Sequence, residues 1–233
     1  MNNAYLEEVR ATALAEAQKA YMVKVYGWMV AGLMSTGLVG GFVASDNSMI
    51  STMVDYFWFF IIAEFALVFA LSAFIHKMST PIAMLAFIGY SVLNGITLSA
   101  VLLAYDESAV LSAFLTTSCT FAAMSVYGIT TKKDLTSWGS FFFMGLIGIV
   151  IASIVNIFLE SSALSFAISL IGVFVFIGLT AYDTQKIKES ADLELQGSEL
   201  ASKGAILGAL TLYLDFINLF LFILRLFGGS SDD

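Results

Sequence analysis

Long apolar segments alternate with short polar ones along the whole chain. A helix needs about 20 apolar residues to cross the hydrocarbon core of a bilayer, and seven segments reach that length. They are 25–44, 56–75, 81–104, 108–130, 138–159, 163–182 and 204–227. The polar connections between them are short, apart from 184–203. The pattern predicts an all-α membrane protein with seven transmembrane helices.

Composition supports the same class. Apolar residues make up 59% of the 233 residues and charged residues only 12%, against about 25% charged residues in soluble domains. The net charge of −8 and the scarcity of basic residues leave no extended patch for nucleic acid. We therefore predict a cytoplasmic N-terminal segment (1–24), a transmembrane domain (25–227) and an acidic extracytoplasmic tail (228–233).

The basic residues predict the orientation of the chain. Seven spans place alternate connections on opposite sides of the membrane, and one side then receives nine of the ten Lys and Arg residues. These are Arg10, Lys19, Lys24, Lys77, Lys132, Lys133, Lys186, Lys188 and Lys203. The other side receives only Arg225. Because cytoplasmic connections are enriched in Lys and Arg, the N-terminus is expected in the cytoplasm and the C-terminus outside.

Three acidic residues lie within the apolar spans. Asp215 is in the middle of the seventh span, Glu64 is inside the second, and Asp183 is at the end of the sixth. A carboxylate at the centre of a membrane helix costs roughly 2.5 to 3.5 kcal/mol on insertion scales, and no Lys or Arg lies deep in any span. Protonation, a shared proton or a bound cation would lower that cost. The acids therefore indicate ions or protons rather than a soluble substrate.

The seventh span has one polar stripe. Projected as a helix, its small and polar residues fall within an arc of about 100°; they are Gly204, Gly208, Thr211, Asp215, Asn218 and Arg225. The other faces are almost wholly apolar, so the helix is expected to pack against other helices through this stripe. A similar stripe on the sixth span ends at Asp183. There Lys186, one turn on, offers a surface ion pair as the structural alternative.

Glu64 and Asp215 are expected at a similar depth. Each lies about 11 residues, or roughly 16 Å, from the cytoplasmic end of its span, close to the midplane. The third span adds polar groups at this depth, among them Asn94 and Thr97. Serine and threonine in membrane helices usually satisfy their own backbone, so only Asn94 is singled out as a candidate.

Two stretches near the C-terminus carry a resemblance to a known family. They read Gly178-Leu-Thr-Ala-Tyr-Asp-Thr-Gln-Lys-Ile-Lys188 and Ala209-Leu-Thr-Leu-Tyr-Leu-Asp-Phe-Ile-Asn-Leu-Phe220, the latter followed by Leu224-Arg225. Further matches are Lys24-Val-Tyr-Gly-Trp-Met29 and Thr130-Thr-Lys-Lys-Asp-Leu135. Over essentially its whole length the chain resembles the Bax-inhibitor-1 (TMBIM) family, in particular the enterobacterial inner-membrane members.

The resemblance implies a fold and a function. Six helices are expected to surround a central seventh, and the protein is expected to be a pH-sensitive calcium leak channel in the bacterial inner membrane. Asp183 and Asp215 match the two aspartates that form the pH sensor of the family. No cofactor is implied, and calcium is the expected permeant ion, held weakly at Asp183 and Asp215. Glu64, Asn94, Asn218, His76 and Arg225 are further candidates for the pathway or its gate.

One position departs from the family. Some members have an arginine at the cytoplasmic end of the second span, which holds the aspartate pair in a closed state. This chain has His76 and Lys77 there, and neither offers the planar, two-pronged donor group of arginine.

A shared proton explains how such a pair would respond to pH. Two carboxylates at one site cannot both ionise cheaply, so they titrate as a unit. The pair would hold one proton near neutral pH and release it as the cytoplasm becomes alkaline. Calcium prefers six to eight oxygen ligands, so two aspartates with carbonyls and water would give a weak site that suits passage.

Two alternatives come from other classes of protein. Tyr182-Asp183 is shared with intramembrane aspartyl proteases, but their Gly-x-Gly-Asp motif is replaced by Leu212-Tyr-Leu-Asp215 and their Pro-Ala-Leu segment is missing. An enzyme is therefore not expected. The second alternative is a regulatory membrane protein that modulates a membrane-anchored protease or a stress response without transport of its own, with 1–24 as the docking segment.

Overall fold

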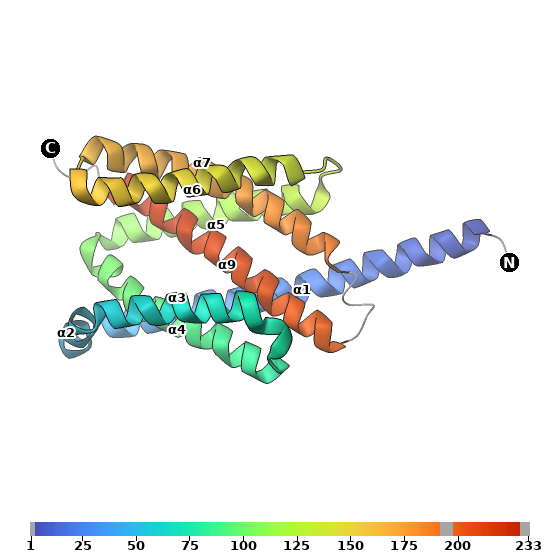
Figure 1. Cartoon of the computed structure of the whole chain (residues 1–233), viewed down its shortest axis with the longest axis horizontal. Helices are drawn as coiled ribbons and strands as arrows, with labels where there is room; N and C mark the ends of the chain where they lie inside the picture. Colours follow the sequence, from blue (N-terminus) through green and yellow to red (C-terminus); the bar gives the residue numbers. More distant parts are fainter. Residues whose placement is uncertain (1–2, 192–197, 229–233) are drawn as a thin grey trace. The chain divides into compact units, whose positions relative to one another are not determined.

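The computed structural model describes residues 3–191 and 198–228, and within these residues the chain is entirely helical (Figure 1). The helices are α1 (Asn3–Ala44), α2 (Asn47–Asp55), α3 (Phe57–Phe74), the 3-10 turn η1 (Ile75–Lys77), α4 (Thr80–Ala104), α5 (Glu107–Thr130), α6 (Thr136–Leu159), α7 (Ser162–Glu189) and α9 (Ser198–Gly228). Seven helices are long and apolar enough to cross a membrane. They coincide with the seven predicted spans, so the all-α membrane class is confirmed.

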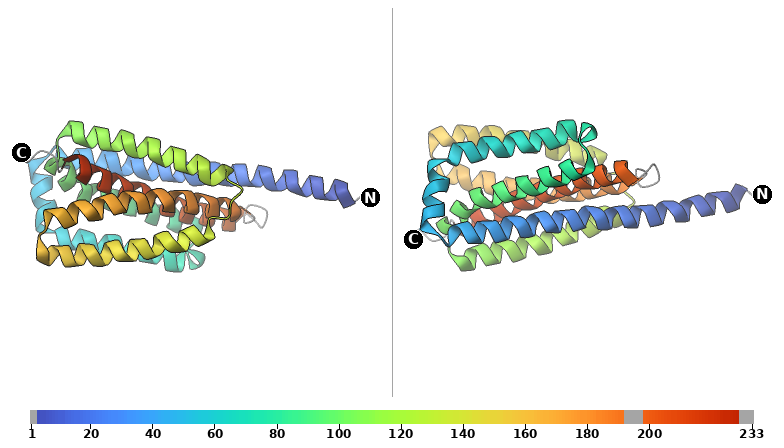
Figure 2. Two further views of the ribbon diagram at one scale, coloured as in Figure 1. Left: turned by 90° about the horizontal axis from the view of Figure 1, so that it is seen from above. Right: turned by 90° about the horizontal axis from the view of Figure 1, so that it is seen from below.

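The helices extend further than the apolar pattern predicts. α1 is continuous over 42 residues, about 63 Å at 1.5 Å per residue, or twice the roughly 30 Å of a hydrocarbon core. The segment 1–24 is thus largely helical, and Figures 1 and 2 show it projecting beyond α3 and α4. The polar connection 184–203 is also partly helical, because α7 continues to Glu189 and α9 begins at Ser198. Asp232 and Asp233 lie outside the described residues.

Local capping explains α2, a helix that the apolar pattern does not predict. Asp46 is its N-cap, and Oδ1 of Asp46 accepts hydrogen bonds from the backbone N–H groups of Ser48 (2.8 Å) and Met49 (3.2 Å). These bonds satisfy two of the amides that the first turn of a helix leaves without partners. The short connection between the first two spans is therefore an ordered helix.

Contacts divide the described chain into two compact units. Unit 1 contains 3–104, 187–191 and 198–211, and unit 2 contains 105–186 and 212–228. Unit 1 therefore includes α1 to α4 and the first half of α9. Unit 2 includes α5, α6, most of α7 and the second half of α9.

In unit 1, α1 packs along α4 and α3 packs on the same helix. Small residues permit the close approach of α1 and α4: a side chain at Gly95 would lie 2.7 Å from the carbonyl oxygen of Thr36. The Thr36 hydroxyl crosses this interface and donates to the carbonyl of Ser91 (2.8 Å). Gly208, on the α9 stripe, faces Ile187 and Val25, as expected for a small residue at a helix–helix contact.

In unit 2, α6 and α7 are joined through Asn156. Its amide donates to the Ser165 hydroxyl (2.7 Å), and its carbonyl oxygen accepts from the backbone of Ser161 (3.1 Å). The chain turns between the two helices at Glu160, which adopts the left-handed conformation with φ of 47°. This conformation is common at the C-terminal end of a helix.

The polar stripe of α9 is not its only buried face, contrary to the sequence prediction. α9 is the most buried of the seven spans, with 72% of its most apolar 18-residue window inside and no more than 39% for the others. Apolar side chains such as Ile206, Leu212 and Leu219 are fully buried, whereas Arg225 on the stripe is exposed. The apolar faces of this helix therefore pack against protein, because neighbouring helices cover them.

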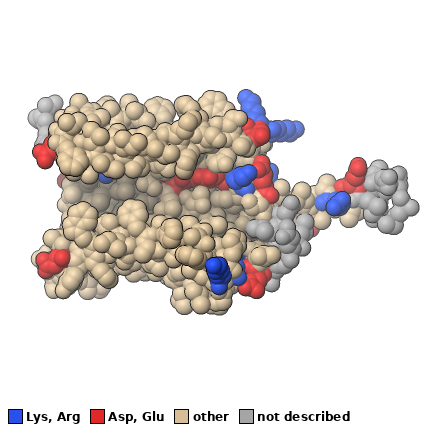
Figure 3. Space-filling view, viewed as in Figure 1, with Lys and Arg blue, Asp and Glu red and all other residues tan. Residues whose placement is uncertain are grey.

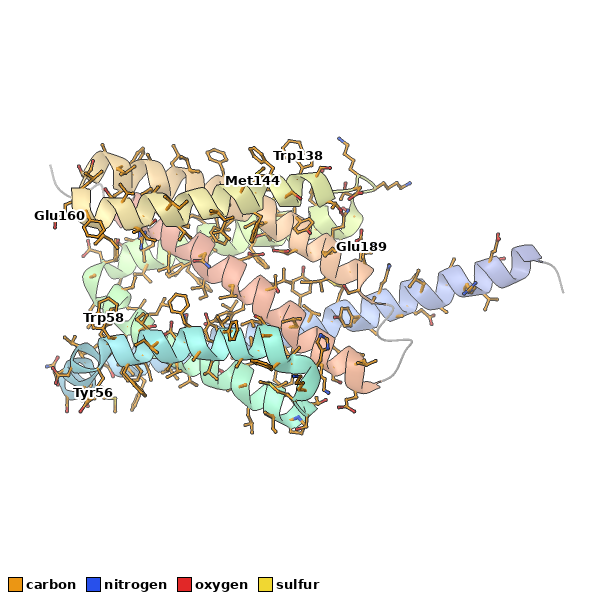
Figure 4. The ribbon with its side chains drawn as sticks, viewed as in Figure 1. Tyr56, Trp58, Trp138, Met144, Glu160 and Glu189 are labelled. Carbon is orange, nitrogen blue, oxygen red and sulfur yellow. The ribbon has the colours of Figure 1, made fainter. Side chains whose placement is uncertain are left out.

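The exposed sides of the other helices suit a lipid environment. Large apolar side chains are exposed along α3 and α6, among them Phe65 and Phe158. In Figure 3 the surfaces along α6 and α3 are almost wholly tan, with charged atoms only near their ends. Trp58 and Trp138 are exposed near the first residues of α3 and α6 (Figure 4), where an interfacial aromatic belt is expected.

Candidate functional site

The end of α7 that carries Asp183 is packed closely against α6 and α5 in unit 2. A side chain at Gly139 of α6 would lie 2.5 Å from Cε2 of Tyr182, so the tyrosine ring lies directly on that glycine. Gly128 of α5 faces Ala181 and Thr184 in the same way. The residues on both sides of Asp183 are thus held by close backbone approach.

Aromatic contacts position the second half of α9. The ring of Phe216 packs edge-on against Phe121 (5.5 Å between centroids) and Phe114 (5.9 Å) of α5. Further along, the ring of Phe222 lies over Gly172 of α7 and next to Phe176 (5.8 Å). Because Phe216 follows Asp215 directly, these rings fix the face that Asp215 presents inside unit 2.

The side-chain carboxyl groups of Asp183 and Asp215 lie close enough to form a hydrogen bond with each other. An ionised carboxylate can only accept hydrogen bonds, so such a bond would require a proton on one of the two groups. Asp215 is 5% exposed, and its Oδ2 is buried with no hydrogen-bond partner among the described residues. The structure thus brings together the two aspartates that the sequence analysis singled out.

The other polar side chains of unit 2 differ in the partners that they contact. The hydroxyl oxygens of Ser125 and Thr184 are buried and, within the described part of the chain, have no hydrogen-bond partner. The Asn218 amide donates to the carbonyl of Leu214 in its own helix (2.8 Å). Arg225 lies over the ring of Phe222, with 5.8 Å between its guanidinium carbon and the ring centroid.

Glu64 belongs to unit 1, where α4 supplies its partners. The Thr97 hydroxyl donates to Oε1 of Glu64 (2.6 Å), and the Asn94 amide approaches Oε2 (3.5 Å). Asn94 is 8% exposed, and Tyr90 is close enough to interact electrostatically with Glu64. Unit 1 therefore contains an acid held by neutral donors.

Thr97 is the residue of this cluster that sequence reasoning missed. Its hydroxyl does bond its own helix, at the Asn94 carbonyl (3.1 Å), as the general rule predicts. The same hydroxyl also lies closer to the Glu64 carboxyl group than the Asn94 amide does. The signal available in the sequence was the spacing: Asn94 and Thr97 are three residues apart and share one face of a helix.

The residues at the position of the family latch are exposed. His76 and Lys77 form part of η1, at the end of α3. The Lys77 ammonium group lies over the ring of Phe74, 5.6 Å from its centroid. In unit 1 this lysine therefore has an aromatic neighbour, and the role of His76 at a gate stays a prediction.

The aspartate pair is not part of a larger group of metal-binding side chains among the described residues. Among them, no group of three or more His, Cys, Asp or Glu side chains is arranged to hold a metal ion. The aspartate pair alone offers two carboxyl groups, whereas calcium in proteins usually takes six to eight oxygen ligands. Any cation held there would need carbonyl, hydroxyl or water oxygens as well.

Comparison with known proteins identifies the family. Residues 18–232 match the family model described as "Inhibitor of apoptosis-promoting Bax1". The chain is 47% identical over 215 residues to the inner membrane protein YbhL of Escherichia coli strain K12, covering 91% of this chain and 92% of YbhL. It is 45% identical to an uncharacterized protein of Deinococcus radiodurans, over 92% of both chains. An uncharacterized membrane protein of Streptococcus pyogenes serotype M1 is 42% identical over 73% of each chain. With seven membrane-spanning helices and a match over nearly its full length, the chain belongs to the Bax inhibitor-1 family of membrane proteins.

Proposed function

We propose that this protein is a pH-sensitive leak channel for cations, with calcium as the main permeant ion. The observation that carries the proposal is the close approach of the carboxyl groups of Asp183 and Asp215 inside unit 2. Its location would be the bacterial inner membrane, where the name of the Escherichia coli relative places that protein. The lipid bilayer and the permeant cation are then its main partners.

The proton of the pair is the proposed switch. While one proton is shared, the two carboxyl groups bond each other and hold α7 against α9. Loss of the proton places two negative charges in contact in a poorly hydrated environment, which is costly. The charged pair attracts a cation and weakens the contact between the helices, so flux should rise as the pair loses its proton.

A weak cation site fits a leak better than a storage site would. The two carboxyl groups supply the charge, and the hydroxyl oxygens of Ser125 and Thr184 are further oxygens of the same unit that have no hydrogen-bond partner among the described residues. Since calcium must leave as readily as it enters, a site with few protein ligands favours passage. In unit 1, Glu64 and Asn94 are the proposed further residues of the pathway.

The proposal includes an arrangement and an orientation. The six other spans would surround α9, which agrees with the burial of that helix. The nine-to-one distribution of basic residues would place the N-terminus in the cytoplasm. Reporter proteins fused to the C-terminus test the orientation: activity outside the cytoplasm is expected, and activity confined to the cytoplasm would contradict it.

A regulatory role is the second candidate, favoured by the N-terminal part of α1. This helix begins at Asn3 and, between residues 7 and 16, exposes nearly every side chain. Such a projecting helix could dock a membrane-anchored protease or another stress-response protein. Under this alternative the protein would modulate its partner and transport nothing itself.

Catalysis is not proposed, although two adjacent aspartates are also the arrangement of aspartic proteases. The sequence around Asp215 lacks the Gly-x-Gly-Asp motif of intramembrane proteases. The relatives described above with informative names are called membrane proteins, and none is named as an enzyme.

A flux assay with purified protein in liposomes tests the proposal. Liposomes enclosing a calcium-sensitive dye would be given an inward calcium gradient over a series of pH values from acid to alkaline. We expect calcium entry with one pH transition, which disappears in the Asp183→Asn variant. Protein-free liposomes and Glu64→Gln are the controls. Entry no faster than in protein-free liposomes at every pH would contradict the channel and favour the regulatory role.

A further inference from the structure

A buried glutamine ties the end of α7 to the connection between α5 and α6. Gln185 is 9% exposed and lies two residues after Asp183. Its Oε1 accepts a hydrogen bond from the backbone N–H of Leu135 (2.9 Å), and its Nε2 donates to the carbonyl of Lys133 (2.8 Å). One side-chain amide thus satisfies a donor and an acceptor of a segment about 50 residues away in sequence.

The connection that Gln185 holds is itself ordered. Leu135 is 6% exposed, and Thr131 accepts a hydrogen bond from the backbone of Lys133 (3.2 Å). Asp134 accepts one from the backbone of Thr136 (2.8 Å). The bonds from Thr136, assisted by the nearby charge of Lys186, hold the pKa of the Asp134 carboxyl below its usual range. The side chains of Lys132 to Asp134 are exposed. The backbone of the same connection is hydrogen-bonded to Gln185 of α7.

No apolar residue could replace Gln185 without a cost. Leucine or methionine would fill a similar volume, but would leave the N–H of Leu135 and the carbonyl of Lys133 without this partner in a buried setting. Tyr182 on Gly139 and Thr184 on Gly128 make further contacts of this helix end. Unlike these two, Gln185 contacts the connection between α5 and α6 directly, where Lys186 acts on Asp134 through its charge.

We propose that Gln185 is a positioning residue for the Asp183–Asp215 pair, because it fixes the turn of α7 that carries Asp183 to the α5–α6 connection. This inference rests on the proposed function for its effect on flux. Without the two bonds, this turn of α7 is free to shift, and Asp183 moves relative to Asp215. A looser pair shares its proton less effectively, so its pH transition moves towards lower pH.

Other charged groups on the elements packed around Asp183 must be considered in any pH effect. They are Glu107 on α5, Lys132, Lys133 and Asp134 in the connection, Lys186, Lys188 and Glu189 on α7, and Glu199, Lys203, Asp215 and Arg225 on α9. The phenols of these elements are Tyr127, Tyr182 and Tyr213, and α6 carries no titratable side chain. Replacement of Gln185 by a neutral residue changes none of these charges, so a shifted transition would come from position.

The test compares Gln185→Met with the matched control Thr180→Val. Thr180 is fully buried on the same helix, but its hydroxyl donates to the Phe176 carbonyl of α7 itself (2.7 Å) and not to the α5–α6 connection. The readout is labelling of Asp183 and Asp215 by a hydrophobic carbodiimide, which reacts with protonated carboxyl groups, followed by mass spectrometry across a pH series. Calcium flux is measured on the same liposomes.

We expect the labelling transition of Gln185→Met to move by about one pH unit towards acid, a tenfold change in proton affinity. Thr180→Val should keep the wild-type transition. Gln185→Asn, which retains a shorter amide and serves if the methionine variant does not fold, should lie between. Faster hydrogen exchange at the Leu135 amide would confirm that the tether is lost.

The outcomes separate this inference from the proposed function. A shift in labelling without calcium flux in any variant, wild type included, would leave the positioning role standing and contradict the channel. Flux with an unchanged labelling transition in both Gln185 variants would overturn the positioning role and leave the channel. An equal shift in Thr180→Val would also overturn it, because any loss of packing in α7 would then suffice.

Discussion

Unit 1 and unit 2 each hold acidic side chains within membrane-spanning helices, and the partners of these acids differ in kind. Glu64 in unit 1 is met by a hydroxyl and an amide, both of which can donate to an ionised carboxylate. Asp183 and Asp215 in unit 2 are met by each other. Donors allow an acid to stay charged, whereas a second acid requires a proton between them. The comparison teaches that the pair is suited to share a proton between two acids, whereas Glu64 is held by neutral donors.

The largest expected effect is loss of the pH response when either aspartate of the pair is replaced. Asp183→Asn, Asp215→Asn and the double variant should flatten the pH dependence of calcium flux to the same extent. Once one carboxyl is replaced by an amide, the other gains a donor that needs no shared proton. Groups that act as one unit give non-additive effects. Two independent, additive shifts of the transition in the single variants would show separate sites.

The substitution Asp215→Asn should stabilise the protein, whereas most substitutions of a buried residue destabilise it. Asp215→Asn keeps the shape of the side chain and removes a carboxyl that is costly inside a membrane helix. We expect the free energy of unfolding to rise by about 1 kcal/mol, or roughly 2 to 4 °C in melting temperature for a chain of this size. The gain should grow towards alkaline pH, where the wild-type pair loses its proton. Thermal unfolding in detergent at several pH values measures it, and a lowered melting temperature at alkaline pH would contradict the prediction.

Substitutions in unit 1 should change the magnitude of the calcium flux and leave its pH midpoint in place. Glu64→Gln removes an acid from the proposed pathway but leaves the aspartate pair intact, so flux should fall while its pH transition stays in place. Thr97→Val removes the 2.6 Å bond to Glu64 and should lower the free energy of unfolding by about 1 to 3 kcal/mol, as for a hydrogen bond to a charged group. Flux titrations and unfolding curves of both variants check this. A shifted pH midpoint in Glu64→Gln would erase the distinction between the two units.

The smallest effect is expected at Asp134, outside the membrane. Its pKa is lowered by hydrogen bonds from Thr136 and, to a lesser extent, by Lys186. An acid with a lowered pKa in the folded state contributes stability above its ordinary value of about 3.9, and the contribution is lost as the pH falls through the lowered value. Because Asp134 is fully exposed, Asp134→Asn should leave stability near neutral pH almost unchanged and remove only this acid dependence. Unfolding curves between neutral and acid pH measure it, and a large loss of stability at neutral pH would contradict the prediction.

The fold was predictable where length and hydrophobicity decide the outcome. Each of the seven spans is a long apolar run that only a helix can carry across a membrane. α2 was not found, because its signal is the single N-cap Asp46 rather than an apolar run. The apolar pattern also does not tell a lipid-facing side from a protein-facing one, so the burial of Leu212 and Leu219 on α9 required the packed structure.

The site was predictable in part for a similar reason. Asp183 and Asp215 stand out because a charged group in an apolar span is costly. Their contact depends on Tyr182 lying on Gly139 and on the rings around Phe216, and no local pattern specifies which faces of distant helices meet. Thr97 and Gln185 were not predicted for the same reason, because each bonds to a partner on another element.

The shared proton is the central claim, and infrared difference spectroscopy tests it most directly. A protonated carboxyl group has a carbonyl-stretching band that an ionised carboxylate lacks. Over a pH titration of the protein in lipid, the account predicts that wild type loses one such band in a single transition. The band should be absent from both Asp183→Asn and Asp215→Asn and should remain in Glu64→Gln. A band that survives either aspartate substitution unchanged, or that disappears in Glu64→Gln, would contradict a proton shared by Asp183 and Asp215.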